Sequence, residues 1–349
     1  KYGSQTLGAI LNLSLLSGSL GCAGAGIYVL AKENNQLGVM DMGAVPDLLP
    51  GRQPIGNQAA RKICEKNWKI NISPDPGLNL VQMIEAAEQG NLKALYMMGE
   101  NPLRAMQQPD RVKNALKNLE FIVVQDILNS ETARIADVVL PAAAISEKEG
   151  SVTNLEGRIQ SFNAVTSPPG KAKPDWEILD LLSAKLGDTN PYGSFEKIRQ
   201  EIQQLVPMYG SLNGADHTWL QTTSDKALFE GEGADGLISF CPVVSTEDAP
   251  ADTDYPFTAI VGSQRYHLGS GTRTRASDRI QAFEFTGKLE ISPQDGAKLD
   301  LKDDDTILVR SRIGSLKRKV QLKKTLPEGH VFVPTGSNDN EAMHLFSLN

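Results

Sequence analysis

Polar side chains that could hold a nucleotide follow three consecutive apolar runs of the sequence. They are Asn101, Asp126 and Lys148. A buried nucleotide needs amide donors for its phosphates, a carboxylate or amide for the guanine edge, and cations for the remaining charge. Asp126 suits the guanine edge, because a carboxylate can accept two hydrogen bonds from N–H groups, and Asn101 and Lys148 suit the other tasks.

The same residues have a simpler interpretation. Aspartate is a common N-cap, so Asp126 would only cap the helix that follows it. The pair Asn101-Pro102 would only form a turn. Spacing alone leaves both interpretations open.

The elements that must position these residues alternate between short apolar strands and amphipathic helices. We expect helices at 80–89, 110–116 and 130–135, and strands at 94–98, 121–125 and 137–140. This alternation is typical of a parallel sheet covered on both faces, in which ligands bind at the carboxyl ends of the strands. The sequence therefore predicts an α/β domain with a doubly wound, mostly parallel sheet.

The segments around this core are less regular. We expect a helix at 5–17, a glycine-rich loop at 18–26, and helices at 176–186 and 195–205. Residues 32–76 are rich in Gly, Pro and Asn and predict a long irregular stretch, which in a compact domain is usually functional or binds a partner.

The last hundred residues change character. Short strands with turn signals between them are predicted at 257–261, 288–291, 306–310, 317–322 and 330–333. This pattern indicates a small barrel or sandwich. We place a domain boundary near residue 250, giving an α/β domain with a connecting segment at 1–250 and a β domain at 251–349.

Composition excludes several classes of protein. The 349 residues carry a formal net charge of −7, which argues against a nucleic-acid binder, because phosphate binding needs an excess of cations. The apolar stretch at 7–20 is interrupted by polar residues, so we expect no direct membrane span and no secretory signal. The chain begins at Lys1 rather than Met, which suggests a fragment or a processed form.

The three cysteines lie far apart, at positions 22, 64 and 241. They cannot supply an iron–sulfur cluster, which needs about four thiolates, and they form no zinc motif. Isolated thiols fit a reducing compartment, so we expect a cytoplasmic protein. The glycines at 18–26 follow a helix and do not spell G-x-G-x-x-G, so the Rossmann fingerprint of an unrelated nucleotide-binding module is absent.

Six segments resemble, in order and approximate spacing, the formate dehydrogenase alpha subunits, which are molybdopterin oxidoreductases of the DMSO reductase superfamily. They are 34–51, 98–102, 123–126, 136–141 with 147–150, 154–158, and 173–176. Two later segments, 262–275 and 291–314, are similar to the family's final domain, a double-psi β-barrel that binds the dinucleotide cofactor. The resemblance covers about residues 5–345.

The resemblance implies a role for each matching position. The guanosine end of a molybdopterin guanine dinucleotide would be held by Asn101, Gln125 and Asp126, with Lys148 and Asp175 completing that side. The segment from Gly262 to Gly271 would contact the pterin and phosphate groups. The polar contacts would come from Ser263 and His267 in this segment and from Thr272 directly after it. For His267 the alternative is a purely structural role between strands.

Two departures restrict what the resemblance implies. The family's amino-terminal portion is not in this sequence. It carries a four-cysteine cluster motif and the Cys or selenocysteine that ligates molybdenum or tungsten. Without it we expect no activity from the chain alone, no catalytic or metal-ligating residue in it, and a cofactor that could be absent. Ala31 also stands where the family has the arginine that orients formate, so a planar bidentate fork is lost.

Two functions of different class therefore remain. The first is the carboxy-terminal cofactor-binding portion of a formate dehydrogenase-like oxidoreductase. Its partners would be the rest of its own polypeptide, or an amino-terminal iron–sulfur portion, and electron-transfer subunits. The second is the molybdopterin-like scaffold domain of the large iron–sulfur subunit of an NADH:quinone oxidoreductase. Ala31 favours the second, whereas Gln125-Asp126, Lys148 and Asp175 favour the first.

Overall fold

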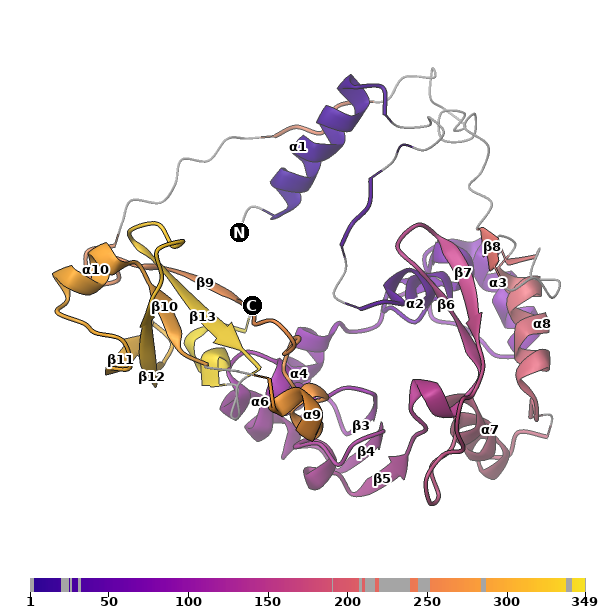
Figure 1. Ribbon diagram of the computed structural model, residues 1–349. Helices are drawn as coiled ribbons and strands as arrows, with labels where there is room; N and C mark the ends of the chain where they lie inside the picture. The colour runs from indigo at the N-terminus through magenta and orange to yellow at the C-terminus, as the bar shows by residue number, and fades with distance from the viewer. Residues whose placement is uncertain are drawn as a thin grey trace. The chain divides into compact units, whose positions relative to one another are not determined.

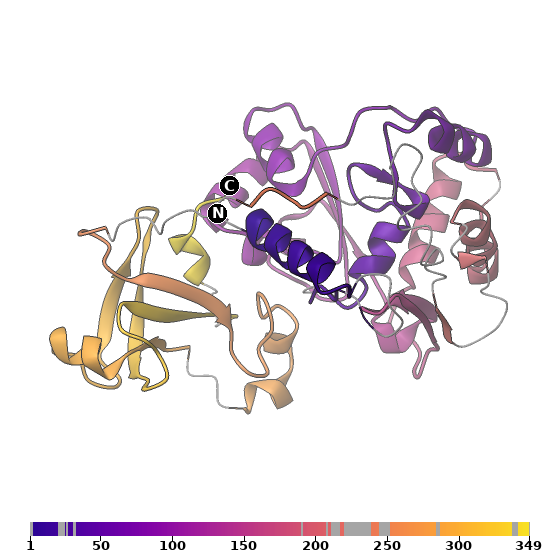
Figure 2. The same cartoon turned by 90° about the horizontal axis from the view of Figure 1, so that it is seen from above.

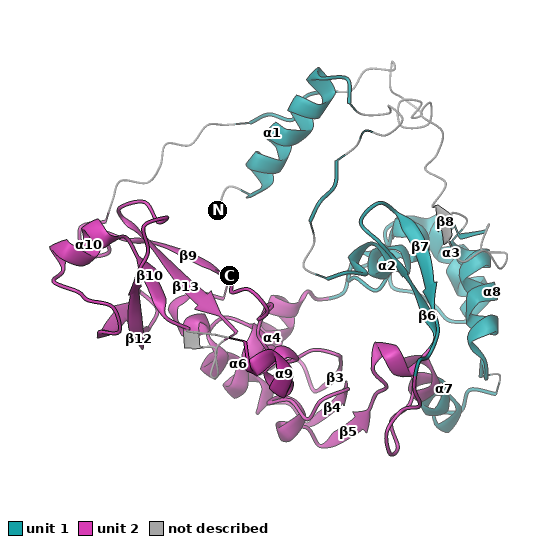
Figure 3. Ribbon diagram, in the orientation of Figure 1, with its two compact units in different colours: residues 1–77, 149–165, 180–249 teal, residues 78–148, 166–179, 250–349 magenta. Residues whose placement is uncertain are grey.

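The computed structural model describes residues 3–19, 25, 27–30, 33–189, 191–206, 209–210, 217–219, 239–243, 252–283, 287–336 and 341–348. The chain forms two compact units (Figure 3). Unit 1 contains residues 1–77, 149–165 and 180–249, and unit 2 contains residues 78–148, 166–179 and 250–349. Each unit is described by itself.

The α/β part of unit 2 is built on three parallel strands in the order β3-β4-β5 (Figure 1). Their bounds are Ala94–Met98, Phe121–Asp126 and Val138–Pro141. Helices α4 (Leu80–Glu88) and α6 (Pro109–Leu116) share one apolar core with the sheet. Successive strand residues point to opposite faces, so Ile122 and Val124 enter this core while Gln125 faces away from it.

Local sequence signals explain where these helices begin. Asn79 accepts a hydrogen bond from the Gln82 amide at 3.0 Å, and the Gln82 side chain accepts one from the Asn79 amide at 2.9 Å, which forms a capping box at the start of α4. Pro109 occupies the first turn of α6, where its missing N–H costs nothing. Short elements complete the strand-end region, namely α5 (Pro102–Ala105), η2 (Ala133–Ile135) and η3 (Ile145–Glu147).

The β part of unit 2 is a five-stranded mixed sheet in the order β11-β12-β10-β13-β9. Figure 2 shows these strands from a second direction, coloured orange to yellow. Their bounds are β9 Thr258–Ser263, β10 Leu289–Ile291, β11 Thr306–Arg310, β12 Ser315–Leu322 and β13 His330–Thr335. The pairs β10–β12 and β13–β9 are parallel, and the pairs β10–β13 and β11–β12 are antiparallel. Val320 and Val333 are fully buried in the core of this sheet.

Short helices connect these strands. They are η5 Thr274–Ala276, α9 Asp278–Gln281, α10 Pro293–Lys298 and η6 Glu341–Leu345. Ser292 caps α10 by accepting a hydrogen bond from the Asp295 amide at 3.0 Å. The buried Asp295 carboxylate accepts one from Gly329 at 2.8 Å, which ties α10 to the start of β13.

Unit 1 contains an antiparallel sheet in the order β6-β7-β8. Its strands are β6 Gly150–Thr153, β7 Arg158–Phe162 and β8 His217–Trp219. The described residues of this unit also form α1 Gly3–Leu16, α2 Gln36–Asp41, β1 Leu48–Leu49, η1 Pro50–Arg52, β2 Gln53–Pro54, α3 Gln58–Trp68 and α8 Phe195–Leu205. Helix α7 (Asp175–Lys185) begins in the sequence of unit 2 and ends in that of unit 1.

The structure corrects three expectations about elements. Residues 32–76 are not one irregular stretch, because Asn57 caps the eleven-residue helix α3 and the short elements α2, β1, η1 and β2 precede it. The helix expected at 130–135 is only the 3₁₀ turn η2. The hairpin β6–β7 has no counterpart among the elements that the sequence predicts.

The parallel sheet of the prediction is confirmed, whereas the predicted domain boundary near residue 250 stays a prediction. Most of the glycine-rich run at 18–26 lies outside the described residues, as do Ala31 and Lys32. In the described part of the chain, no helix has both the length and the apolar character that crossing a membrane requires.

Candidate functional site

A chain of polar side chains lies at the carboxyl ends of the parallel strands in unit 2. The Tyr96 hydroxyl on β3 donates to Gln125 Oε1 on β4, and Gln125 Nε2 donates to Asp175 Oδ1 at 2.8 Å. Lys148 Nζ forms an ion pair with Asp175 Oδ2. Gln125 is fully buried; it and Tyr96 are on the adjacent strands β4 and β3, Lys148 follows η3 and Asp175 begins α7. We call these four residues the strand-end network.

The electrostatics of the strand-end network follow from partial burial. Burial raises the pKa of the Tyr96 hydroxyl, and the charge of Asp175 raises it further, so Tyr96 stays protonated and acts as a donor. The Lys148 and Asp175 side chains keep 22% and 30% of their surface exposed. A ligand can therefore still reach both charged groups, whereas Gln125 is closed off.

Asp126 follows Gln125 as the last residue of β4 and takes no part in the strand-end network. Its Oδ1 accepts hydrogen bonds from the amides of Ile127 at 2.7 Å and Leu128 at 3.4 Å. These contacts match the simpler interpretation, in which the aspartate stabilises the turn after the strand. Among the described residues Oδ2 has no hydrogen-bond partner, and the half-buried carboxylate keeps one oxygen for a ligand.

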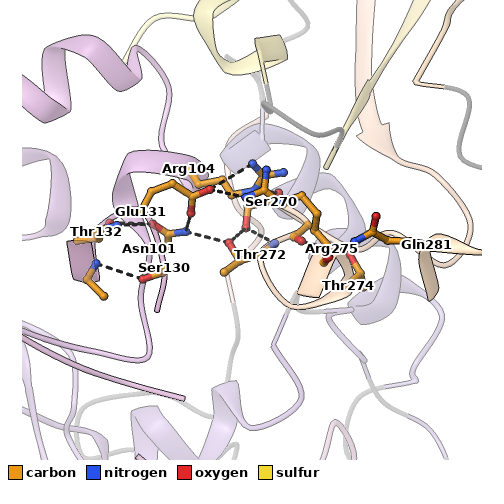
Figure 4. Close-up of polar contacts among 12 residues, drawn as sticks. Asn101, Arg104, Ser130, Glu131, Thr132, Ser270, Thr272, Thr274, Arg275 and Gln281 are labelled. Atoms are coloured by element: carbon orange, nitrogen blue, oxygen red, sulfur yellow. Dashed lines mark hydrogen bonds and ion pairs between the residues drawn. The ribbon is translucent and has the colours of Figure 1, made fainter. Parts of the chain in front are cut away.

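A second group of polar side chains links the strand-end loops to the loop after β9 (Figure 4). It consists of Asn101, Arg104, Glu131, Ser270, Thr272 and Arg275, which we call the anchoring cluster. Asn101 Nδ2 donates to Glu131 Oε2 at 2.8 Å and to Thr272 Oγ1 at 3.1 Å. Arg104 Nε donates to the Ser270 carbonyl at 2.6 Å, and Arg275 donates to Glu131 Oε1 at 2.7 Å. All six residues belong to unit 2.

Glu131 is the central anion of the anchoring cluster. Burial raises the pKa of its carboxyl, but hydrogen bonds from Asn101 and from the backbone amide, together with the charges of Arg104 and Arg275, outweigh burial. The pKa therefore lies below its ordinary value, and the group is ionised at neutral pH. Two arginines and one glutamate leave the cluster with a net positive charge.

The other predicted residues lie in and beside the loop that follows β9. Ser263 Oγ accepts a hydrogen bond from the Gly269 amide at 2.9 Å, which closes the loop. His267 lies in the same loop, is 4% exposed, and donates its backbone amide to Gln264 at 3.1 Å. Gly262 is at the end of β9, where an added Cβ would come within 3.0 Å of the Phe332 ring.

Gly271 shows how tightly this loop is packed. Its φ of +73° is in the left-handed region, and an added Cβ would lie 2.5 Å from the Gly336 carbonyl oxygen. Glycine is needed here for the conformation and for the close approach of the two backbones.

The structure brings the predicted residues together in two groups. Gln125, Lys148 and Asp175 form one network, with Asp126 next in the chain to Gln125. Asn101 and Thr272 are bonded in the anchoring cluster, Gly262 and Ser263 end strand β9, and His267 lies in the loop that runs from β9 to Thr272.

Sequence reasoning missed four residues that the structure adds, namely Tyr96, Arg104, Glu131 and Arg275. Two of them carried a signal, because Glu131 follows a strand end and Arg104 lies in the first turn after Asn101-Pro102.

An apolar cavity of about 590 Å³ lies within the β part of unit 2. Its lining includes Phe257, Leu289, Ile307, Val331 and Phe346. None of the nine predicted residues lines it, so it belongs to the sheet core and not to the candidate site.

Comparison with known families gives two matches along the chain. A model described as Molybdopterin oxidoreductase matches residues 1–185. A second, described as Molydopterin dinucleotide binding domain, matches residues 257–347. The first covers more than half of the chain, and the second contains strands β9 to β13 and the glycine-bearing loop that follows β9.

Several curated proteins are similar over nearly the whole chain. The F420-dependent formate dehydrogenase subunit alpha of Methanocaldococcus jannaschii is 35% identical over 95% of this chain and 51% of its own length. One of the NADH-quinone oxidoreductase subunits of Rhizobium meliloti is 33% identical over 99% of this chain and 38% of its own length. The chain thus spans about half, or less, of the curated relatives that it matches.

A solved structure shares the fold. The acetylene hydratase from Pelobacter acetylenicus aligns with a TM-score of 0.57 at 18% identity, covering 84% of this chain and 46% of its own. The resemblance to formate dehydrogenase alpha subunits is confirmed by the matched models and relatives. This chain belongs to the molybdopterin oxidoreductase family.

Proposed function

We propose that this chain is the carboxy-terminal cofactor-binding portion of a formate dehydrogenase-like oxidoreductase and holds a molybdopterin guanine dinucleotide. The observation that carries the proposal is the strand-end network. Three residues predicted to hold the guanosine end, Gln125, Lys148 and Asp175, are joined by a hydrogen bond and an ion pair beside the carboxyl end of β4, the edge at which parallel sheets bind ligands.

The donor set fits a guanine-bearing cofactor. The Oδ2 atom of Asp126 and the half-buried Asp175 can accept hydrogen bonds from guanine N–H groups, and Lys148 can balance phosphate charge. On the β side, Gly262, Ser263, His267 and Thr272 are proposed to contact the pterin and phosphate groups. When bound, the cofactor's metal, molybdenum or tungsten, supplies the electron-transfer chemistry.

Finer features of the fold belong to the same proposal. The mixed five-stranded sheet β9–β13 is proposed to be a double-psi β-barrel, supported by its combination of parallel and antiparallel pairs. The α/β sheet is proposed to be doubly wound, since α4 and α6 cover one face and Gln125, on the opposite face, bonds to the first residue of α7.

The redox centre is proposed to lie outside these residues. The three cysteines are too few for an iron–sulfur cluster, so the chain alone should be inactive. It is proposed to work with the rest of its polypeptide, or an amino-terminal iron–sulfur portion, and with electron-transfer subunits in the cytoplasm.

A second candidate is a scaffold domain of an NADH:quinone oxidoreductase that holds no cofactor. The sequence favours it at Ala31, where the arginine of formate dehydrogenases is missing, and one relative is named as a subunit of such an enzyme. The two candidates differ in whether the protein contains guanine nucleotide.

The proposal is tested with Asp126→Asn in the full-length protein. The amide would turn an N–H group toward guanine donors, and a hydrogen bond to a charged group is worth roughly 1.5–3 kcal/mol, so cofactor affinity should fall about tenfold or more. Bound guanine nucleotide is measured after dialysis. The control is Asp110→Asn, whose side chain is 84% exposed. Equal occupancy in the Asp126 and Asp110 variants would overturn the role of Asp126.

A further inference from the structure

Asn101 uses its whole hydrogen-bonding capacity inside the protein. A carboxamide has two N–H donors and two acceptor positions. The two donors go to Glu131 and Thr272, and Oδ1 accepts from the amide of Thr132 at 3.2 Å and from its hydroxyl at 2.7 Å. The residue is 5% exposed, so nothing remains with which it could hold a ligand without breaking a bond already made.

Asn101 does not play the local role that its position offers. It stands at the N-cap of α5, yet its side chain makes no capping hydrogen bond. The side chain instead reaches Glu131, which follows the next strand, and Thr272, which is 171 residues away in the sequence. Its contacts are therefore long-range and join segments that approach each other only in the fold.

Glu131 is held from both sides in the same way. Oε2 accepts from Asn101, while Oε1 accepts from Arg275 and lies 3.7 Å from an Arg104 nitrogen. The Arg104 side chain is 3% exposed. A buried arginine is stable only when a carboxylate and further acceptors surround it, and here Glu131 and the Ser270 carbonyl provide them.

The partners of Asn101, Arg104 and Glu131 converge on one short segment, 270–275. Ser270 is bonded through its carbonyl, Thr272 through its hydroxyl and Arg275 through its guanidinium. Gly271 lies between them in a left-handed conformation that leaves little freedom. The segment is thus fixed by side chains that come from the strand-end loops.

We propose that Asn101 and Glu131 are positioning residues that fix segment 270–275 against the strand-end loops, and that they do so before any cofactor binds. The inference deepens the proposed function, on which it rests, because it changes Asn101 from a contact of the guanosine end to a support of the loop. In the loop after β9, Thr272 and its neighbours would then contact the cofactor. At the parallel sheet, Asp126, Lys148 and Asp175 would do so.

A variant that removes the charge of Glu131 distinguishes a positioning role from a purely electrostatic role. Glu131→Gln keeps the shape of the side chain but removes its negative charge, so the cluster becomes more positive. If Glu131 only set the potential felt by an anionic cofactor, the variant would bind that cofactor more tightly. If Glu131 positions the loop, the variant binds the cofactor more weakly, because the hydrogen bond from Arg275 loses its charged acceptor and the ion pair with Arg104 loses its anion.

The experiment measures amide hydrogen exchange of the full-length protein, prepared both with cofactor and from a host that cannot make molybdopterin. Asn101→Asp and Glu131→Gln should each lower the protection of amides in 268–275 about tenfold in both preparations, since a hydrogen bond to a charged group is lost. Protection in β3–β5 should stay as in the wild type, which shows that the variants are folded.

A double variant provides the rescue. Asn101→Asp combined with Glu131→Gln moves the carboxylate across the same hydrogen bond and keeps the total charge, so loop protection should rise above that of both single variants. It should stay below the wild type, because Arg104 and Arg275 still face a neutral residue 131. Glu120→Gln is the matched control, because it removes the anion of the exposed Lys93–Glu120 ion pair elsewhere in unit 2 and should leave 268–275 unchanged.

Unchanged protection of 268–275 in the cofactor-free single variants would overturn the inference, as would tighter cofactor binding by Glu131→Gln. Failure of the proposed function gives a different result. In that case the wild-type protein contains no guanine nucleotide, while the effect of the variants on loop protection in the cofactor-free protein is still seen.

Discussion

At the scale of single residues, hydrogen-bond capacity divides the polar groups of the site into two kinds. Asn101 is saturated by protein groups, and Gln125 is fully buried between Tyr96 and Asp175. Asp126 keeps Oδ2, and the charged side chain of Lys148 stays partly exposed. The saturated or buried groups stabilise the arrangement, whereas Asp126 and Lys148 can bind a ligand.

Gly271 provides a stability test at this scale. We expect Gly271→Ala to lower the free energy of unfolding by more than the roughly 1–2 kcal/mol that a left-handed conformation costs an L-residue, because its Cβ would also lie 2.5 Å from the Gly336 carbonyl oxygen. Gly329→Ala is the control, with φ of +74° and nothing within 4 Å of the added Cβ. Denaturant unfolding of the two variants gives the comparison, and equal losses would show that the close approach at Gly271 has no cost.

The lowered pKa of Glu131 predicts a pH dependence. A carboxyl whose pKa is lower in the folded than in the unfolded state stabilises the fold above the unfolded value, near 4.5, and loses that contribution as the pH falls through the folded value. The difference in unfolding free energy between wild type and Glu131→Gln should therefore be constant near neutral pH and shrink below about pH 4.5. A difference that stayed constant into the acid range would contradict the ionised state assigned to Glu131.

At the scale of elements, strand ends and their loops position the site, and the helices behind the sheet hold the strands. Helix α4 contributes Ile84 and Ala87 to the same core as Val124 of β4. Any change that loosens α4 therefore acts on the strand whose end carries Gln125 and Asp126.

The capping box of α4 allows this to be tested. Asn79→Ala removes the acceptor for the Gln82 amide and should cost about 1 kcal/mol of unfolding free energy. Asn79→Ser keeps an acceptor at the cap and should cost distinctly less. Thermal or denaturant unfolding measures both, and an alanine variant as stable as the serine variant would show that the cap contributes nothing.

The strands and helices in the α/β part of unit 2 could be predicted, because the spacing of the apolar residues and the length of each apolar run indicate the same type of element. Strands β3, β4 and β5 are apolar runs between amphipathic helices, and they were expected within one or two residues. Helix α3 is hard to predict, because a stretch rich in Gly, Pro and Asn precedes it and its own composition is largely polar. Its signals are the cap Asn57 and the apolar residues Ala60, Cys64 and Trp68 at helical spacing. The hairpin β6–β7 lacks a two-residue turn of the Asn-Gly kind that would reveal it.

The site was predictable only in part for a related reason. Gln125, Lys148 and Asp175 could be named from their resemblance to a family, and the fold then joined them. The contact between Asn101 and Thr272 spans 171 residues, and no local pattern in the sequence reports such a pairing. Glu131 and Arg104 gain their importance from the same distant partners.

At the scale of the whole molecule, two matched families account for most of the chain. The Molybdopterin oxidoreductase model covers 1–185 and the dinucleotide binding model covers 257–347. Relatives over nearly the full chain include a formate dehydrogenase subunit and an NADH-quinone oxidoreductase subunit, each extending well beyond it. The fold is therefore shared by proteins of different named activity, and the content of the site has to decide between the candidates.

The most direct test denatures the wild-type full-length protein, purified from a host that makes molybdopterin cofactors, and assays the released material for guanine nucleotide and pterin fluorescence. Both should be present, because Asp126, Lys148 and Asp175 are proposed to hold a guanine-bearing cofactor. Protein that releases neither would contradict cofactor binding and leave the scaffold function.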